Sequence, residues 1–179
     1  MNDASNAALR TCVREIDSHV AQLGWDRPPF LFALAPTADL LDAGADLAGE
    51  DQAFLREILA DVPDHLTAIL QDDLPAVELE ELLGRIEFPE QVVGAAISVE
   101  RVVLPPSAEE DMPADPDEQA RWAENHPDRT DVRVITAVLR DGQMWCGVRA
   151  KSHPEPDALM QGADLAPGLT NALLATLQG

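Results

Sequence analysis

The residues best suited to bind a ligand lie close together in residues 131–151, which we interpret as a β-hairpin. Trp145, Arg149 and Lys151 recur at positions that project from one side of a strand, and His153 is next in phase. An aromatic ring beside two cations suits a carboxylate, an acidic peptide or an anionic metabolite. The competing interpretation, which we favour, is that acidic helices of the same chain neutralise these cations, or that the cations face water.

No other group of residues forms a catalytic or metal-binding motif. The four histidines are isolated in the sequence, and none has a second ligand at the short spacing of a zinc site. The chain contains no glycine-rich phosphate loop and no nucleophile elbow. Adjacent acids such as Asp72-Asp73 and Glu80-Glu81 are expected by chance among 33 acidic residues and indicate solvated helix faces. We therefore expect no catalytic residue, no bound metal and no cofactor.

The positions of the two cysteines indicate that both serve as small apolar side chains. Cys12 falls in a helical pattern and Cys146 on the apolar face of the hairpin, and neither belongs to a CxxC or Cys/His cluster. We expect both to be buried and not to form a disulfide or redox pair.

The overall charge narrows the class of partner. The chain has 179 residues and a formal net charge of −21, so it would be repelled by nucleic acid and by anionic membrane surfaces. No apolar run reaches the roughly 20 residues of a membrane span, and residues 1–8 lack the cationic start and apolar core of a signal peptide. We expect a cytoplasmic protein that binds neither nucleic acid nor membrane.

The charge is also unevenly distributed. Residues 50–90 hold twelve acids and two arginines, and residues 105–131 hold nine acids and two arginines. Residues 132–153, in contrast, carry four cations and one acid, a net charge of +3. The hairpin is the cationic region of the sequence, which is why the candidate anion site is placed there.

The Asp141-Gly142 pair predicts the register of the hairpin, because a two-residue type I′ turn requires positive φ at both central positions. A turn there pairs Leu139 with Met144, and the same register along the two strands makes one face of the hairpin wholly apolar. That face contains Leu139, Met144, Ala137, Cys146, Ile135 and Val148.

The segment from Phe30 to Ala35 is apolar at every position. It is either a strand covered on both faces or an edge strand covered by another subunit. The prolines at 28 and 29 favour the edge, where missing amide donors cost least. We therefore expect a homodimer, through this segment or the sheet face, and name its candidate interface residues: Phe30, Leu31, Phe32 and Leu34.

The remaining patterns predict an α+β fold. Apolar residues at spacings of three and four predict a helix from Ser5 to Gly24, and Pro167 begins a closing helix. Residues 50–86 predict a layer of helical pieces inserted between strands one and two, and residues 92–104 form the next strand. The result is one domain, 1–179, with a mainly antiparallel sheet of about four strands. Residues 105–131 form an acidic, partly mobile surface segment that contains a short helix after Asp115.

Five motifs are distributed over nearly the whole chain: GWDRPP at 24–29, LFALAPT at 31–37, VERVVLPP at 99–106, VLRDG at 138–142 and GADLAPGL at 162–169. They resemble those of an uncharacterised actinobacterial family of small acidic cytoplasmic proteins, and this resemblance implies no catalytic residues. The order of elements also resembles the small acidic α+β chaperones of bacterial secretion systems, which are dimers that bind other proteins. That second resemblance rests on architecture and acidity alone.

These observations support two hypotheses about function. The leading one is a non-enzymatic protein-binding adaptor or chaperone-like module, because no catalytic constellation is present and the charge is separated along the chain. The alternative is a domain or enzyme that binds a small anion in a pocket on the Trp145, Arg149 and Lys151 face of the hairpin.

Overall fold

A six-stranded antiparallel sheet forms the centre of the computed structural model, which describes residues 3–42, 49–71 and 79–178. The strand order is β2-β1-β3-β4-β5-β6, and every neighbouring pair is antiparallel. The predicted α+β class is thus confirmed, although the sheet has six strands rather than about four. The strands are β1 (Phe30–Pro36), β2 (Leu66–Leu70), β3 (Gly94–Val103), β4 (Thr130–Leu139), β5 (Met144–Ala150) and β6 (Met160–Gly162).

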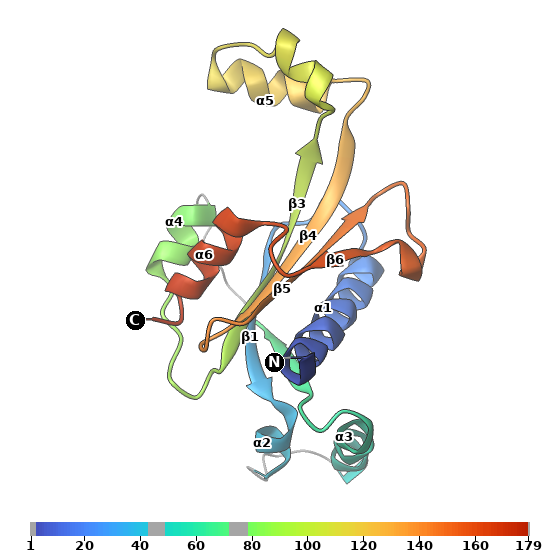
Figure 1. Ribbon diagram of the computed structural model, residues 1–179, viewed down its shortest axis with the longest axis vertical. Helices are drawn as coiled ribbons and strands as arrows, with labels where there is room; N and C mark the ends of the chain where they lie inside the picture. The colour runs from blue at the N-terminus through green and yellow to red at the C-terminus, as the bar shows by residue number, and fades with distance from the viewer. Residues whose placement is uncertain (1–2, 43–48, 72–78, 179) are drawn as a thin grey trace.

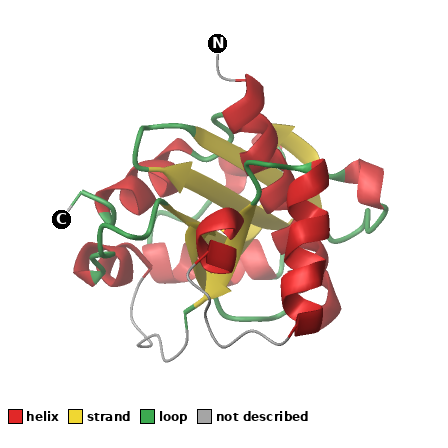
Figure 2. Ribbon diagram, turned by 90° about the horizontal axis from the view of Figure 1, so that it is seen from below, coloured by secondary structure: helices red, strands yellow, loops and turns green. Residues whose placement is uncertain are grey.

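Helices cover both faces of the sheet, as Figures 1 and 2 show. The first helix, α1 (Asp3–Leu23), lies on one face, and α4 (Leu79–Arg85) and α6 (Pro167–Ala175) lie on the other. At one end of the molecule are α2 (Thr37–Asp42) and α3 (Gly49–Asp61). At the opposite end, β3 and β4 extend beyond the other strands and carry η1 (Pro106–Asp111) and α5 (Pro116–Glu124). A short helix η2 (Pro156–Ala158) precedes β6.

The sheet separates two apolar cores, because successive side chains of a strand point to opposite faces. On the α1 face, Ile135 and Ala137 pack with Val13 and Ile16 of the helix. On the other face, Ile97 and Val138 pack with the α4 and α6 residues Leu83, Leu173 and Leu177. Burial on both faces explains why the central strands are apolar at nearly every position.

Sequence reasoning does not predict two of the six strands, β2 and the three-residue β6. Residues 66–70 were assigned to the inserted helical layer, but they form β2 and pair with β1 from Pro36↔Leu66 to Phe32↔Leu70. A short apolar run does not distinguish helix from strand by periodicity, and here the pairing with β1 decides. β1 is consequently an internal strand between β2 and β3, so the predicted edge position was wrong.

The hairpin turn also differs from the prediction, by one residue of register. Gly142 has φ of +93°, whereas Asp141 does not have positive φ, so the turn is not type I′. Leu139 N donates to Gln143 O at 2.9 Å and closes a three-residue loop. Ala137 therefore pairs with Trp145 rather than with Cys146, which instead pairs with Thr136. The predicted apolar face is therefore divided, since Ile135 and Ala137 pack in the α1 core and Met144 packs against the core on the other face.

The helical predictions hold for the ends of the chain, with adjusted bounds. The first helix spans Asp3–Leu23, so it begins two residues before the predicted start at Ser5. The helices after Asp115 and from Pro167 form as predicted. Within the helical layer of residues 50–86, the sequence also predicts that one helix starts at Pro75, and this position lies outside the described residues. Among the helices that are described, none has the length and apolar composition needed to cross a bilayer.

Candidate functional site

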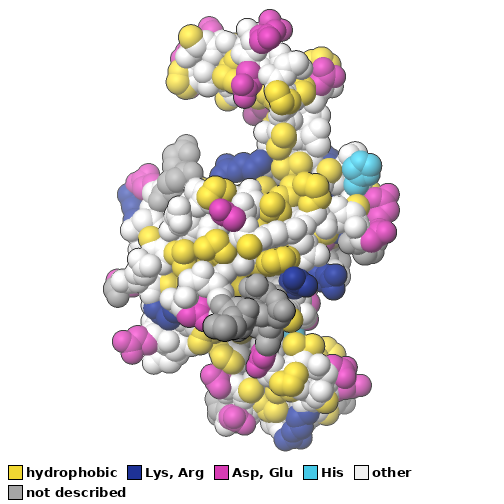
Figure 3. Space-filling view, in the orientation of Figure 1, with side chains coloured by type: hydrophobic (Ala, Val, Ile, Leu, Met, Phe, Trp, Pro, Cys, Tyr) yellow, Lys and Arg dark blue, Asp and Glu magenta, His cyan; other side chains and the backbone are white. Residues whose placement is uncertain are grey.

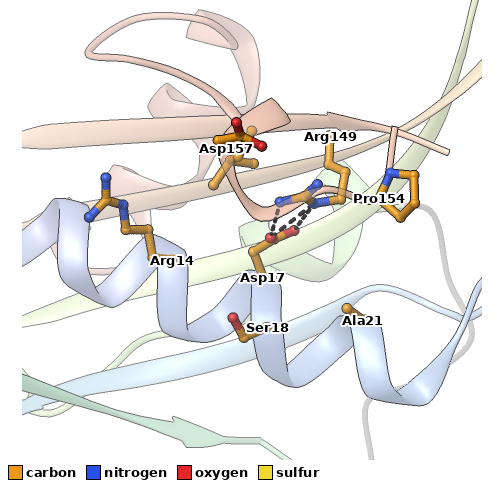
Figure 4. A pocket seen from close by; sticks show the side chains of 8 residues that line it. Arg14, Asp17, Ser18, Ala21, Arg149, Pro154 and Asp157 are labelled. Carbon is orange, nitrogen blue, oxygen red and sulfur yellow. Dashed lines mark hydrogen bonds and ion pairs between the residues drawn. The ribbon is translucent and has the colours of Figure 1, made fainter. Parts of the chain in front are cut away.

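Arg149, the centre of the predicted anion site, is buried beneath α1 and paired with Asp17 of that helix (Figure 4). Its Nε lies 3.0 Å from both Asp17 carboxylate oxygens, and Nη2 donates to Oδ2 at 2.8 Å. Nη1 donates to the carbonyl oxygens of His153 at 2.9 Å and Glu155 at 2.7 Å. All three guanidinium nitrogens therefore donate to groups of the same chain. This agrees with the interpretation that the chain's own acids neutralise the cations of the hairpin.

Arg133 joins the same buried cluster, because it is the cross-strand partner of Arg149. Only 1% of its surface is exposed, and its guanidinium lies 4.5 Å from the ring centroid of Trp25. Its Nη1 is 3.7 Å from Asp17 Oδ1. Burial lowers the pKa of Arg133, and the nearby carboxylates of Asp17 and Glu100 oppose that shift. Two arginines therefore share Asp17 inside the fold, with Glu100 adding negative charge from β3.

The other predicted ligand-binding residues are not gathered on one open face. Trp145 lies 4.6 Å from the Arg10 guanidinium, and its Nε1 donates to Gln161 Oε1 at 3.0 Å. Lys151 lies after the end of β5, with Nζ 5.7 Å from the Trp25 ring. His153 is exposed, and its Nδ1 is 3.9 Å from the carboxylate of Glu155.

A pocket of about 600 Å³ does lie beside Arg149 (Figure 4). The charged side chains that line it have no net charge, because two arginines, Arg14 and Arg149, stand against two aspartates, Asp17 and Asp157. Arg149 already donates to Asp17 and to two backbone carbonyls, so it has little capacity to bind an added anion. This arrangement stabilises the packing of α1 on the sheet rather than favouring an anion.

The candidate interface residues are part of the interior of the chain. Leu31, Phe32 and Leu34 are at most 3% exposed, and Phe30 is partly buried against the α1 core. Leu31 packs into the core on the α4 and α6 side, and Phe32 and Leu34 into the α1 core. A contact between copies through these side chains would require the sheet to lose its own helices.

A different surface is both apolar and open. A groove of about 580 Å³ lies between α1, α3 and β2, and its lining includes Phe32, Phe54, Leu55, Ile58 and Leu70. None of the α3 side chains that the structure describes is buried, and Phe54 is 62% exposed. Figure 3 shows hydrophobic side chains gathered at the end of the molecule where α2 and α3 lie, with acidic side chains around them. An amphipathic helix with its apolar side uncovered typically contacts a partner.

A chain of polar side chains lies at the base of this groove. His65 Nε2 is 2.8 Å from Glu15 Oε1, and Nδ1 is 2.6 Å from Thr37 Oγ1, which is 2.7 Å from Thr67 Oγ1. A hydroxyl, imidazole and carboxylate in this order resemble the nucleophile, base and orienting acid of covalent catalysis. Thr37 is fully buried, however, so its hydroxyl does not reach a substrate. The chain of contacts instead connects the start of α2 to β2 and α1.

Sequence reasoning missed both the groove and the His65 contacts. His65 was interpreted as isolated, because its partners Thr37 and Glu15 are 28 and 50 residues away in the sequence. The sequence did contain one indication of the groove, the apolar residues Phe54, Leu55 and Ile58 on one side of α3. In the structure these side chains line the open groove instead of packing in a core. Both cysteines, in contrast, are buried and free, as predicted.

The fold and the groove define a class of protein: an acidic α+β protein with one antiparallel sheet and an open apolar surface at one end. Among the residues that the structure describes, no cluster of histidine, cysteine, aspartate and glutamate is arranged to hold a metal. The chain belongs to the PPA1309-like protein family, whose model matches residues 9–178. No curated protein and no solved structure matches the chain. Membership in this family is consistent with the predicted resemblance to a protein family over nearly the whole chain, while the five motifs and the actinobacterial origin stay predictions.

Proposed function

We propose that this protein is a non-enzymatic binding module, an adaptor or chaperone-like protein that holds an apolar segment of another protein in the groove between α1, α3 and β2. The observation that carries the proposal is the exposure of Phe54 at 62% on a groove of about 580 Å³. Burial of an aromatic side chain of this kind is worth about 1.5–3 kcal/mol, which is a substantial part of a binding free energy.

The chemistry of the groove supports binding rather than catalysis. Its polar side chains include Glu15, His65 and Thr67, and His65 is held between Glu15 and Thr37. The alternative function, an anion held by Trp145, Arg149 and Lys151, is less favoured. Arg149 is occupied by Asp17, and Trp145 is covered by Arg10.

The experiment is a peptide selection with a matched pair of variants. A display library of random twelve-residue peptides is selected on the purified protein, and the affinity of enriched peptides is measured by fluorescence anisotropy. Phe54→Asp places a charge in the groove, whereas Met160→Asp changes a side chain of nearly the same exposure, 63%, on β6 at the other edge of the sheet. Binding should weaken at least about tenfold in Phe54→Asp, equivalent to about 1.4 kcal/mol, and stay unchanged in Met160→Asp.

Two results would contradict the proposal. One is a selection that enriches no peptide with saturable binding. The other is an equal loss of affinity in both variants, because an effect shared with β6 cannot come from the groove. Circular dichroism of both variants excludes unfolding as the cause of a loss.

A further inference from the structure

The groove is bordered by β2, the edge strand of the sheet that the structure describes. β2 lies at one end of the strand order, and among the described residues β1 is its only neighbouring strand. Edge strands of soluble proteins are commonly protected by a charge, a proline or a bulge. The sequence of β2, Leu-Thr-Ala-Ile-Leu, contains no charge and no proline. The strand at the other edge, β6, is three residues long and ends at Gly162.

The hydrogen bonds to β1 show which backbone groups of β2 face outward. Gln71 N donates to Leu31 O at 2.8 Å, so Gln71 faces β1. Bonded and non-bonded positions alternate along an antiparallel pair, and this places the N–H and C=O groups of Ala68 and Leu70 on the side away from β1. These are the groups that an added strand would use.

The same two residues direct their side chains into the groove. Ala68 and Leu70 line it, whereas Ile69 between them does not and is 42% exposed. Cross-strand neighbours share a face of the sheet. Every second side chain of a strand added beside β2 would therefore enter the groove between α1 and α3, where Phe54 and Leu55 are available for contact.

The acidic side chains near the groove favour a partner with positive charge. Glu15 is part of the lining, with 52% of its side chain exposed. On α3 and in the turn before β2, the exposed charged side chains that the structure describes are Glu57, Asp61 and Asp64 against Arg56. An acidic margin attracts Lys and Arg. It repels a second copy of this chain, whose own net charge is −21.

We propose that the partner binds as an extended segment that adds to the sheet as an antiparallel strand beside β2, with apolar residues at every second position and Lys or Arg among the others. This inference rests on the proposed function and specifies its partner. The backbone of Ala68 and Leu70 supplies the hydrogen bonds, the groove receives the apolar side chains, and the acidic margin receives the cations.

The first test is the pattern of the enriched peptides. Strand addition predicts apolar residues with a period of two and a surplus of Lys and Arg. It also predicts that N-methylation of one alternate set of amides in a selected peptide lowers affinity at least about tenfold, while N-methylation of the other set has little effect. Raising the salt concentration from about 50 to about 500 mM should weaken binding several-fold, because exposed charges are screened.

The second test is hydrogen exchange measured by NMR on the full chain with a selected peptide. The amides of Ala68 and Leu70 should gain at least about tenfold protection on binding, because they acquire partners. The amides of Thr67 and Ile69, which already face β1, serve as internal controls and should change little.

The outcomes separate this inference from the proposed function. Peptides that depend on Phe54 but show helical spacing of three and four, with unchanged exchange at Ala68 and Leu70, would overturn strand addition and leave groove binding in place. Absence of any peptide that depends on Phe54 would overturn both. Sedimentation that shows a dimer without peptide, together with protection of the Ala68 amide, would assign the edge to a second copy and overturn the proposed partner.

Discussion

Asp17 of α1 and Arg149 of β5 form a buried ion pair, with 2.8 Å between Asp17 Oδ2 and Arg149 Nη2, across 132 residues of sequence. Both side chains are at most 7% exposed. Arg133 lies 3.7 Å from the same carboxylate. Asp17 thus neutralises two cations that the sheet carries on its α1 face, and α1 is held to the sheet by charge as well as by its apolar stripe.

Removal of Asp17 should be strongly destabilising, because Arg149 and Arg133 would remain buried with less compensation. We expect Asp17→Ala to lower the free energy of unfolding by about 3–5 kcal/mol in urea denaturation. The matched control is Glu81→Ala, which removes an exposed pair with Arg85 within α4 and should cost only about 0.3–0.5 kcal/mol. A double-mutant cycle of Asp17→Ala with Arg149→Ala should show coupling; additive losses would contradict the pairing.

Two glycine substitutions should have opposite signs. A Cβ at Gly94 would lie 2.4 Å from the backbone oxygen of Val138, whereas a Cβ at Gly84 in α4 has no neighbour within 4 Å. Gly94→Ala should therefore cost roughly 1–3 kcal/mol through overpacking. Gly84→Ala should stabilise by about 0.5–1 kcal/mol, because alanine favours the helix. Thermal unfolding measures both, and a Gly94→Ala variant that is as stable as the unaltered protein would contradict the close approach of β3 and β4 at this position.

The thiol of Cys12 should be unreactive in the folded protein. Burial, together with the nearby Glu15 carboxylate, raises the pKa of Cys12 from 9.0 to about 12. At pH 8 the thiolate is scarce, and iodoacetamide should label Cys12 slowly until denaturant is added. Rapid labelling of the folded chain at this residue, identified by mass spectrometry, would show that α1 is not packed as described.

The same pKa shift predicts a dependence of stability on pH. Above pH 9.0 the unfolded thiol ionises while the folded thiol stays protonated up to about pH 12. The contribution of Cys12 is thus complete below pH 9.0 and is lost above it at about 1.4 kcal/mol per pH unit. Between pH 9.0 and about 12, the free energy of unfolding of Cys12→Ala should fall less steeply with pH than that of the unaltered protein. Denaturation curves measured across this range test this, and the same slope in both proteins would contradict the raised pKa of Cys12.

Arg140 should not tolerate replacement by lysine. Its Nε donates to Val92 O at 2.6 Å and its Nη2 to Pro89 O at 2.7 Å, and Nη1 donates to Leu177 O. One guanidinium thus connects the end of β4 to the segment before β3 and to the chain after α6. A single ammonium group does not span these acceptors, so Arg140→Lys should cost about 1–3 kcal/mol. Arg85→Lys, at an exposed site, should stay within about 0.5 kcal/mol, and equal losses would contradict this role.

The positions of the candidate site could be predicted only in part. The sequence placed cationic residues on the hairpin and suggested that acidic helices of the same chain neutralise them. Arg149 is indeed neutralised within the chain, but by Asp17 of α1, which lies outside the two acidic regions of the sequence. The sequence did not predict the groove, because its walls come from α1, β2 and α3, which are distant in the sequence. The sequence also predicted a helical piece where β2 forms, because an apolar run of five residues is too short for its periodicity to distinguish a helix from a strand.

The sequence by itself determined the local features: the amphipathic stripe of α1, the long strands β3 and β4, the closing helix from Pro167 and the burial of both cysteines. These features follow from periodicity, proline and apolarity, which act over a few residues. Only the tertiary structure decided the hairpin register, because a three-residue loop that ends at Gly142 competes with the two-residue turn. It also decided which strand lies at the edge and which acid meets Arg149, because such pairings depend on segments that are brought together only by folding.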